Sequence, residues 1–195
     1  MVRGAILLTT INAKWIHPSL ALRLLKANLG DLEGDCEILE FALRQPVAEK
    51  LAAIQDRRPG ILGISVSIWN HGVTLELLEA LEREWAAPVA PGASSPAGPV
   101  VVLGGPEVSY LPEDAEIFRH ADYVIRGEGE DAFRELCGVL LGRGEPAAGD
   151  QRDDGRNDGQ TNKRNDEQRG RPPVRFINGS PADLARIRQA YHYYG

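Results

Sequence analysis

The sequence is poor in cysteine, and this scarcity excludes two common ways of holding a small domain together. Its two cysteines, Cys36 and Cys137, can build neither a disulfide framework nor a four-thiolate metal site. Free cysteine is among the residues most often found in protein interiors. Both residues are therefore predicted to be small hydrophobic members of the core.

Long apolar runs and an excess of positive charge are also absent. No run approaches the roughly 20 apolar residues that a membrane-spanning helix requires, and the stretch "AILLTT" near the N-terminus is too short for the core of a signal peptide. We therefore expect a soluble, cytoplasmic protein with no membrane partner. The net charge of -6, with both signs mixed along the chain, offers no basic face for phosphates, so no nucleic-acid partner is expected.

Apolar runs of strand length alternate with stretches of helical period, which is the pattern of a parallel sheet covered by helices on both faces. Strands are predicted at 4–10, 36–43, 60–67, 99–105 and 121–127, and helices at 18–30, 46–58, 70–85, 112–120 and 128–142. The predicted fold class is α/β, with a flavodoxin-like or Rossmann-like, doubly wound parallel sheet of five strands.

Three segments depart from this alternation. Residues 86–98 are rich in proline, glycine, alanine and serine and are predicted to form a long flexible loop. Residues 143–171 carry charges of both signs and almost nothing apolar, so we expect a disordered linker. A short apolar strand at 174–177 and a tyrosine cluster at 191–194 follow. The chain thus divides into a domain at 1–142, a linker at 143–171 and a connector at 172–195.

Ligands of open parallel sheets bind beyond the carboxyl ends of the strands, so the loop after the third strand, "SVSIWNHG", is the first place to search. Asn70 is a suitable N-cap for the next helix, and the serines can satisfy local backbone donors. Alternatively, Ser65 and Ser67 lie on one side of the strand and direct their hydroxyls at a ligand that Trp69 covers. Both interpretations remain open.

The loop after the fourth strand contains a glycine pair. Gly104 and Gly105, followed by Pro106, allow the backbone to approach a ligand closely, although a tight turn explains the pair equally well. Glu107 is a candidate polar contact for the ligand, or a solvated or capping residue.

The loops after the fifth and the first strand add weaker candidates. "RGEGED" places Gly127 and Glu128 after the fifth strand but lacks the third glycine of the dinucleotide fingerprint, and its acidic residues favour a helix cap over an anion site. Nothing in the sequence resembles a nucleophile with a paired base, a carboxylate dyad or a metal-ligand cluster. The loop after the first strand offers four polar or aromatic candidates: Asn12, Lys14, Trp15 and His17.

Four segments, in this order, resemble the cobalamin-binding domain at the N-terminus of many radical S-adenosylmethionine enzymes: "NAKWIHPSLALRLLKANL", "GISVSIWN", "VVLGGPEVSY" and "DYVIRGEGEDAF". The resemblance covers roughly residues 3–142 and is greatest to an uncharacterised branch of that family. It implies that cobalamin is the partner and cofactor. It also implies that the corrin lies over the carboxyl end of the sheet, above the first loop, with its nucleotide tail in a slot lined by Ser65, Ser67, Gly104 and Gly105.

The chain departs from the family pattern at two places. The first loop lacks the Asp-x-His-x-x-Gly motif that donates a histidine to cobalt, so the resemblance implies cobalamin without that standard ligand and leaves open whether His17 or Trp15 lies below the metal. The Cys-x-x-x-Cys-x-x-Cys motif that holds an iron-sulfur cluster cannot be built from two cysteines. The iron-sulfur cluster and S-adenosylmethionine would then belong to a catalytic domain downstream, which makes this chain either a fragment, the interpretation we favour, or a stand-alone binding module.

Two alternatives use the same fold. A flavodoxin-like domain that binds flavin or nucleotide needs a phosphate-binding loop after the first strand, and "TTINAKWIHPS" contains no glycine. A receiver-like signalling or protein-interaction domain needs an acidic cluster at the ends of the first strands, where the only charged residue is Lys14. Fold alone does not separate these functions.

Overall fold

The computed structural model describes residues 5–13, 17–85, 98–143, 174–181 and 185–194. The segments predicted to be a flexible loop and a charged linker lie almost entirely outside these ranges, as do Lys14 and Trp15. No helix of the described residues is long and apolar enough to cross a membrane.

Six parallel strands form one sheet in the order β2-β1-β3-β4-β5-β6. The predicted α/β class is confirmed, but the predicted number of five strands is wrong. The sixth strand is the apolar run predicted in the connector; it pairs with the fifth strand and forms the edge of the sheet. The sequence of such a short run does not indicate which strand it pairs with. The strands are β1 (Ile6–Asn12), β2 (Cys36–Ala42), β3 (Ile61–Ser65), β4 (Val100–Gly104), β5 (Tyr123–Arg126) and β6 (Arg175–Asn178).

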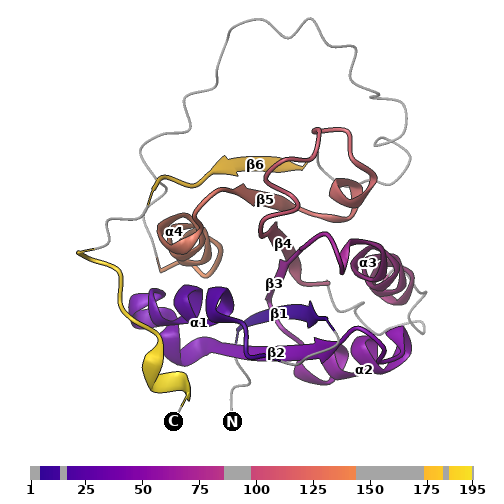
Figure 1. Cartoon of the computed structure of the whole chain (residues 1–195), viewed down its shortest axis with the longest axis horizontal. Coiled ribbons are helices and arrows are strands. Elements are labelled where there is room, and N and C mark those ends of the chain that lie inside the picture. The colour runs from indigo at the N-terminus through magenta and orange to yellow at the C-terminus, as the bar shows by residue number, and fades with distance from the viewer. Residues whose placement is uncertain (1–4, 14–16, 86–97, 144–173, 182–184, 195) are drawn as a thin grey trace, which may run out of the picture.

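Helices cover both faces of the sheet, as Figure 1 shows with the sheet seen nearly edge-on. One face carries α1 (Leu20–Ala27) and α4 (Glu130–Leu140), and the other carries α2 (Val47–Arg57) and α3 (His71–Trp85). The predicted helix at 112–120 is a short 3-10 helix, η2 (Glu116–His120), in its second half. Two further 3-10 helices, η1 (Gly30–Asp35) and η3 (Tyr191–Tyr194), have no counterpart in the predicted pattern.

A hydrophobic core lies on each face because successive side chains of a strand point to opposite sides. In β1, Leu7 and Ile11 belong to the core under α2 and α3, whereas Ile6 and Leu8 belong to the core under α1 and α4. Cys36 and Cys137 are buried in the second core, which confirms their predicted role. Burial raises the pKa of each thiol to about 12, so neither cysteine is ionised near neutral pH.

The C-terminal segment folds back onto the outer side of α1, where it is drawn in yellow in Figure 1. The Arg188 backbone N–H donates to Asn28 Oδ1 over 2.8 Å, and Asn28 Nδ2 donates to the Arg188 carbonyl over 3.1 Å. Glu33 of η1 accepts hydrogen bonds from the Tyr193 hydroxyl and, over 2.7 Å, from Arg188 Nη1. Ala190 is buried between these contacts. Part of the predicted connector, from Arg188 to Tyr193, is thus hydrogen-bonded to the domain.

Acidification should loosen this attachment. The Tyr193 hydroxyl, followed by Arg188, holds the pKa of Glu33 below its usual value of 4.5. A carboxyl group whose pKa is lowered by folding stabilises the fold above its unfolded pKa, and this contribution is lost as the pH falls through the folded pKa. NMR titration of the Glu33 carboxyl carbon should give a midpoint below 4.5, and Tyr193→Phe should raise it. His192→Gln, which removes a weaker charge effect, is the control with a smaller shift; equal shifts in the two variants would contradict the assignment.

Candidate binding slot at the carboxyl edge of the sheet

A slot of about 390 Å³ opens at the carboxyl edge of the sheet, on the face covered by α1 and α4. Its volume falls within the roughly 300–1,000 Å³ typical of small-molecule sites. Most of its lining is hydrocarbon. The sheet and its loops contribute Leu8, Gly63, Ile64, Ser65, Val102, Leu103, Gly104, Gly105, Pro106, Ser109, Tyr110, Ile125, Gly127 and Gly129, and the helices contribute Ala21, Leu22, Leu25, Glu130 and Phe133.

The register of the central strands explains why space remains there. Ser65 pairs with Gly104 at the carboxyl edge, and two residues further in Gly63 lies between Leu8 and Val102. Three neighbouring positions that face the helices therefore carry a hydrogen atom or a hydroxymethyl group instead of a large side chain. Over Gly63 the side chains of Leu8 and Phe133 close the space, but an added Cβ atom at Gly104 would meet only the Ile125 carbonyl, at 3.8 Å. The slot is therefore open over the strand ends and ends at a floor above Gly63.

Gly105 holds the end of β4 against the end of β3. Its φ of +102° is in the region that favours glycine, and a Cβ atom there would lie 2.6 Å from the Val66 carbonyl oxygen and 2.9 Å from Ser65 Oγ. The Val66 N–H donates to the Gly104 carbonyl over 2.8 Å, and the Glu107 N–H donates to the Val66 carbonyl over 3.2 Å. The sequence predicts that the backbone at Gly105 approaches a ligand closely. In the structure it approaches Val66, directly after β3, and forms a wall of the slot.

Ser109 joins the loops after β4 and β5. Its hydroxyl donates to the Gly105 carbonyl over 3.1 Å and accepts the Gly127 N–H over 3.1 Å. Gly127 also has a positive φ, of +82°, and lines the slot with Gly105. One hydroxyl therefore sets the spacing between the two glycine turns that form this wall.

Asn70 and Ser67 have structural roles beside the slot. Asn70 is fully buried and directly precedes α3, as predicted for an N-cap. Its side chain does not cap that helix: Oδ1 accepts the Ser67 N–H over 2.8 Å, and Nδ2 donates to the Ile11 carbonyl over 3.0 Å. Because β3 ends at Ser65, Ser67 leaves the strand alternation and lies outside the slot lining. The structure brings Ser65, but not Ser67, to the slot.

The other predicted site residues surround the slot without lining it. Glu107 pairs with His71, 3.3 Å from Oε1 to Nδ1. His17 is exposed, and Asn12, at the end of β1, has a buried Nδ2 atom with no hydrogen-bond partner in the described structure. Glu128 is exposed beside Gly127.

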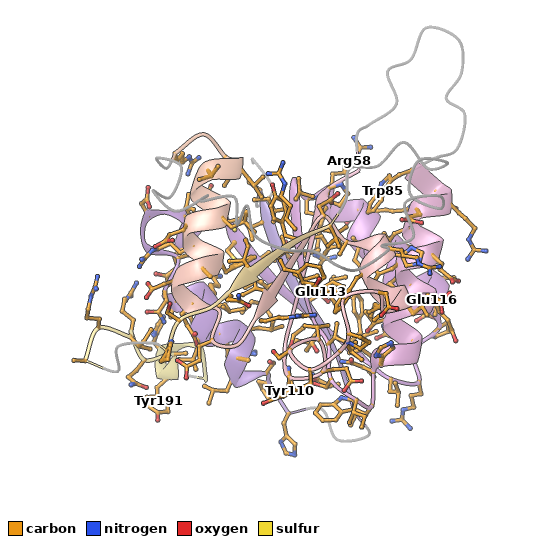
Figure 2. The ribbon with its side chains drawn as sticks, turned by 90° about the horizontal axis from the view of Figure 1, so that it is seen from above. Arg58, Trp85, Tyr110, Glu113, Glu116 and Tyr191 are labelled. Carbon is orange, nitrogen blue, oxygen red and sulfur yellow. The ribbon has the colours of Figure 1, made fainter. Side chains whose placement is uncertain are left out.

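An apolar surface surrounds the mouth of the slot. Trp69 is 54% exposed, Ile68 is 77% exposed and Tyr110 is 90% exposed. Leu20, the first residue of α1, and Leu43, which directly follows β2, are exposed at the same edge. Figure 2 shows Tyr110 at the end of the molecule away from Arg58, which directly follows α2 at the opposite, amino edge. Exposed apolar groups gathered at one edge are typical of a binding surface.

Sequence reasoning missed several residues that define the slot. Gly63 interrupts the apolar run "GILGIS", and a glycine within a strand often marks the close approach of another group; this signal was present. Phe133 and Ser109 gave no such signal, because one is an ordinary core position of an amphipathic helix and the other a single serine in a loop. Among the described residues, no group of three or more His, Cys, Asp or Glu side chains could hold a metal ion.

The model of the B12-binding domain family matches residues 6–137, about two thirds of the chain. The chain therefore belongs to the B12-binding domain family. The matched range begins in β1 and ends in α4, so it includes every strand and helix that lines the slot.

Two solved structures are similar in fold. The cobalamin-dependent S-adenosylmethionine radical enzyme OxsB has a TM-score of 0.50 and 16% identity over 72% of this chain and 19% of that chain. A cobalamin-binding protein from Desulfitobacterium hafniense DCB-2 has a TM-score of 0.48 and 15% identity over 71% of this chain and 59% of that chain. The present chain thus spans less than two thirds of either protein. No curated protein matches the sequence.

Gly105→Ala should destabilise the fold more than Gly142→Ala does. Both glycines have positive φ, but a Cβ atom at Gly142 meets nothing within 4 Å, whereas at Gly105 it meets the β3 backbone. We expect a loss of about 1–2 kcal/mol at Gly142 from the backbone conformation alone, and about 1–3 kcal/mol more at Gly105 from the forced displacement. Urea unfolding of the two variants measures the difference, and equal losses would show that the Gly105 contact is unimportant.

Proposed function

We propose that this chain is the cobalamin-binding module of a radical S-adenosylmethionine-type enzyme, with the corrin over the carboxyl edge of the sheet and the nucleotide tail in the slot. The slot between Ser65 and Gly104 is the observation that carries this proposal. It lies where open α/β sheets bind their ligands, in a chain of the B12-binding domain family.

The slot suits a nucleotide tail in both shape and chemistry. Its mouth offers the Ser65 hydroxyl, which can donate to a ribose or phosphate oxygen, and the Ser109 oxygen, which can accept from a ribose hydroxyl. Its interior offers hydrocarbon from Leu22, Val102 and Phe133, against which a flat aromatic base can pack. Gly104 leaves room for the tail above the strand ends, because an added Cβ atom there would meet only the Ile125 carbonyl, at 3.8 Å.

The surface around the mouth suits a large, flat ring. Ile68, Trp69 and Tyr110 project from two different loops of the carboxyl edge. A macrocycle laid over this edge would remove their apolar surface from water, a gain of roughly 25 cal/mol per Å² buried. It would also lie close to the first loop, where the unpartnered Asn12 Nδ2 could donate to an oxygen on the edge of the ring.

The cofactor would carry the chemistry, and this chain would hold and orient it. The proposed residues can bind the tail and cover the ring. The cluster and S-adenosylmethionine would belong to a separate catalytic domain, because two cysteines cannot hold an iron-sulfur cluster of the Cys-x-x-x-Cys-x-x-Cys type. Support for this catalytic partner comes from the resemblance of the four sequence segments to radical enzymes.

Filling the slot should abolish tail-dependent binding. Gly104 is the best position for this change, because its φ is not positive and an added Cβ atom would meet only the Ile125 carbonyl, at 3.8 Å. Absorbance titrations should show saturable binding of hydroxocobalamin by the wild-type chain. Cobinamide, which has the corrin but no nucleotide tail, should bind at least 10-fold more weakly. Gly104→Leu should remove this advantage of cobalamin over cobinamide.

Gly34→Leu is the matched control. Gly34 is exposed, and an added Cβ atom there contacts nothing within 4 Å, so the same substitution should leave binding unchanged. Equal affinity of the wild-type chain for cobalamin and cobinamide would refute the tail slot. A folded chain that alters neither spectrum would refute cobalamin binding and favour a flavin or nucleotide ligand instead.

A further inference from the structure

We infer that the slot selects the lower base of the corrinoid, accepting an apolar benzimidazole-type base and discriminating against a purine base that carries an amino group. This inference rests on the proposed function, because it assumes that the nucleotide tail enters the slot. It goes beyond that function by naming the chemical class of corrinoid that the chain binds.

The slot has two levels with different chemistry. At the carboxyl edge, Ser65 and Gly104 are paired across β3 and β4, and the Ser109 hydroxyl lies on the adjoining loop. Two residues further in, roughly 7 Å along the strands, Leu8, Gly63 and Val102 form the next level. Hydroxyl groups line the outer level, and no side chain that lines the inner level carries a polar atom.

The helices extend this contrast. Glu130 is the first residue of α4 and lies at the outer level, whereas Phe133 lies one turn further in and is 3% exposed. Leu22 and Leu25 of α1 and Ile125 of β5 complete the inner walls. The backbone groups of Gly63 are used in the ladders with β1 and β4. A base at the inner level thus meets hydrocarbon and the edge of an aromatic ring, with no side-chain acceptor for an amino group.

Gly63 sets the depth of the inner level. A Cβ atom at this position would lie 2.8 Å from Leu8 Cδ2 and 3.2 Å from Phe133 Cζ, so these two side chains already pack over Gly63 and form the floor of the slot. A base cannot shift deeper to bring an amino group to a polar partner. Placing a donor in such a site without an acceptor costs affinity, and we expect an adenine-type base to bind roughly 10- to 100-fold more weakly than dimethylbenzimidazole.

The test compares three corrinoids on the whole chain by absorbance or calorimetric titration: cobalamin, the cobamide with an adenine lower base, and cobinamide. The base must leave cobalt before it can enter the slot. Adenine coordinates cobalt more weakly than dimethylbenzimidazole does, so this step alone would make the adenine cobamide bind more tightly. A preference for cobalamin must therefore come from the slot. Val102→Thr, which places a hydroxyl at the inner level with little change of shape, should reduce the cobalamin-to-adenine affinity ratio. The free-energy cost of releasing each base from cobalt is the same for the wild-type chain and for Val102→Thr, so it cancels when their affinity ratios are compared.

The outcomes separate the inference from the proposed function. Tighter binding of cobalamin than of the adenine cobamide, with a smaller ratio in Val102→Thr, supports base selection. Equal binding of the two complete corrinoids, both tighter than cobinamide, overturns base selection and leaves the tail slot intact. Equal binding of all three, or of none, overturns the tail slot and base selection together. Thermal unfolding verifies the fold of Val102→Thr. Val100→Thr, the same change two residues earlier in β4 and outside the slot lining, is the control and should leave the ratio unchanged.

Discussion

The contact of the Gly105 backbone with the backbone of Val66 and the hydroxyl of Ser65 is the constraint on which the carboxyl edge depends. It brings the ends of β3 and β4 closer than any side chain would allow. Through the Ser109 hydroxyl, the same turn is joined to Gly127 at the end of β5. Three strand ends are therefore fixed relative to one another by two glycine turns and one serine, and the slot has a wall that needs no ligand to form it.

The path of the chain after β3 gives its polar residues different roles: Asn70 makes hydrogen bonds within the fold, and Ser65 lines the slot. Asn70 turns inward and uses its amide to hold the Ser67 N–H and the end of β1, so a residue that looks suitable for ligand binding is consumed by the fold. Buried amides must be paired in this way, because an unpaired one would cost free energy. Ser65, still in the strand, keeps its side chain on the slot face. Trp69 and Ile68 lie between them on the exposed turn, where the loop has no core to enter.

Much of this fold follows from the alternation of apolar and helical segments, because a strand buried on both faces needs a continuous apolar run. At β6 the apolar run at 174–177 predicts a strand, but its membership of the sheet could not be predicted, because Arg175–Asn178 is a short edge strand with both ends exposed. The prediction fails at Ser67: strand alternation places this residue beside Ser65, but the strand ends two residues earlier. The position of Gly104 and Gly105 could be predicted, whereas the group that Gly105 approaches, the neighbouring strand, depends on a pairing that local sequence does not encode.

The slot is made by side chains that are missing, and this explains why a search for reactive residues finds so little. Ser65 and Gly104 leave space at the strand ends, Gly63 lets Leu8 and Phe133 pack closely over it, and the surrounding residues are mostly hydrocarbon. Glu130 supplies the one carboxylate among the described lining residues, so the main contributions of such a site are to recognise shape and to exclude water. Such a site is useful to a protein whose ligand carries the reactive atom. Small residues at the strand ends therefore explain two features together: they provide room for a cofactor, and they carry few groups that could act as catalysts.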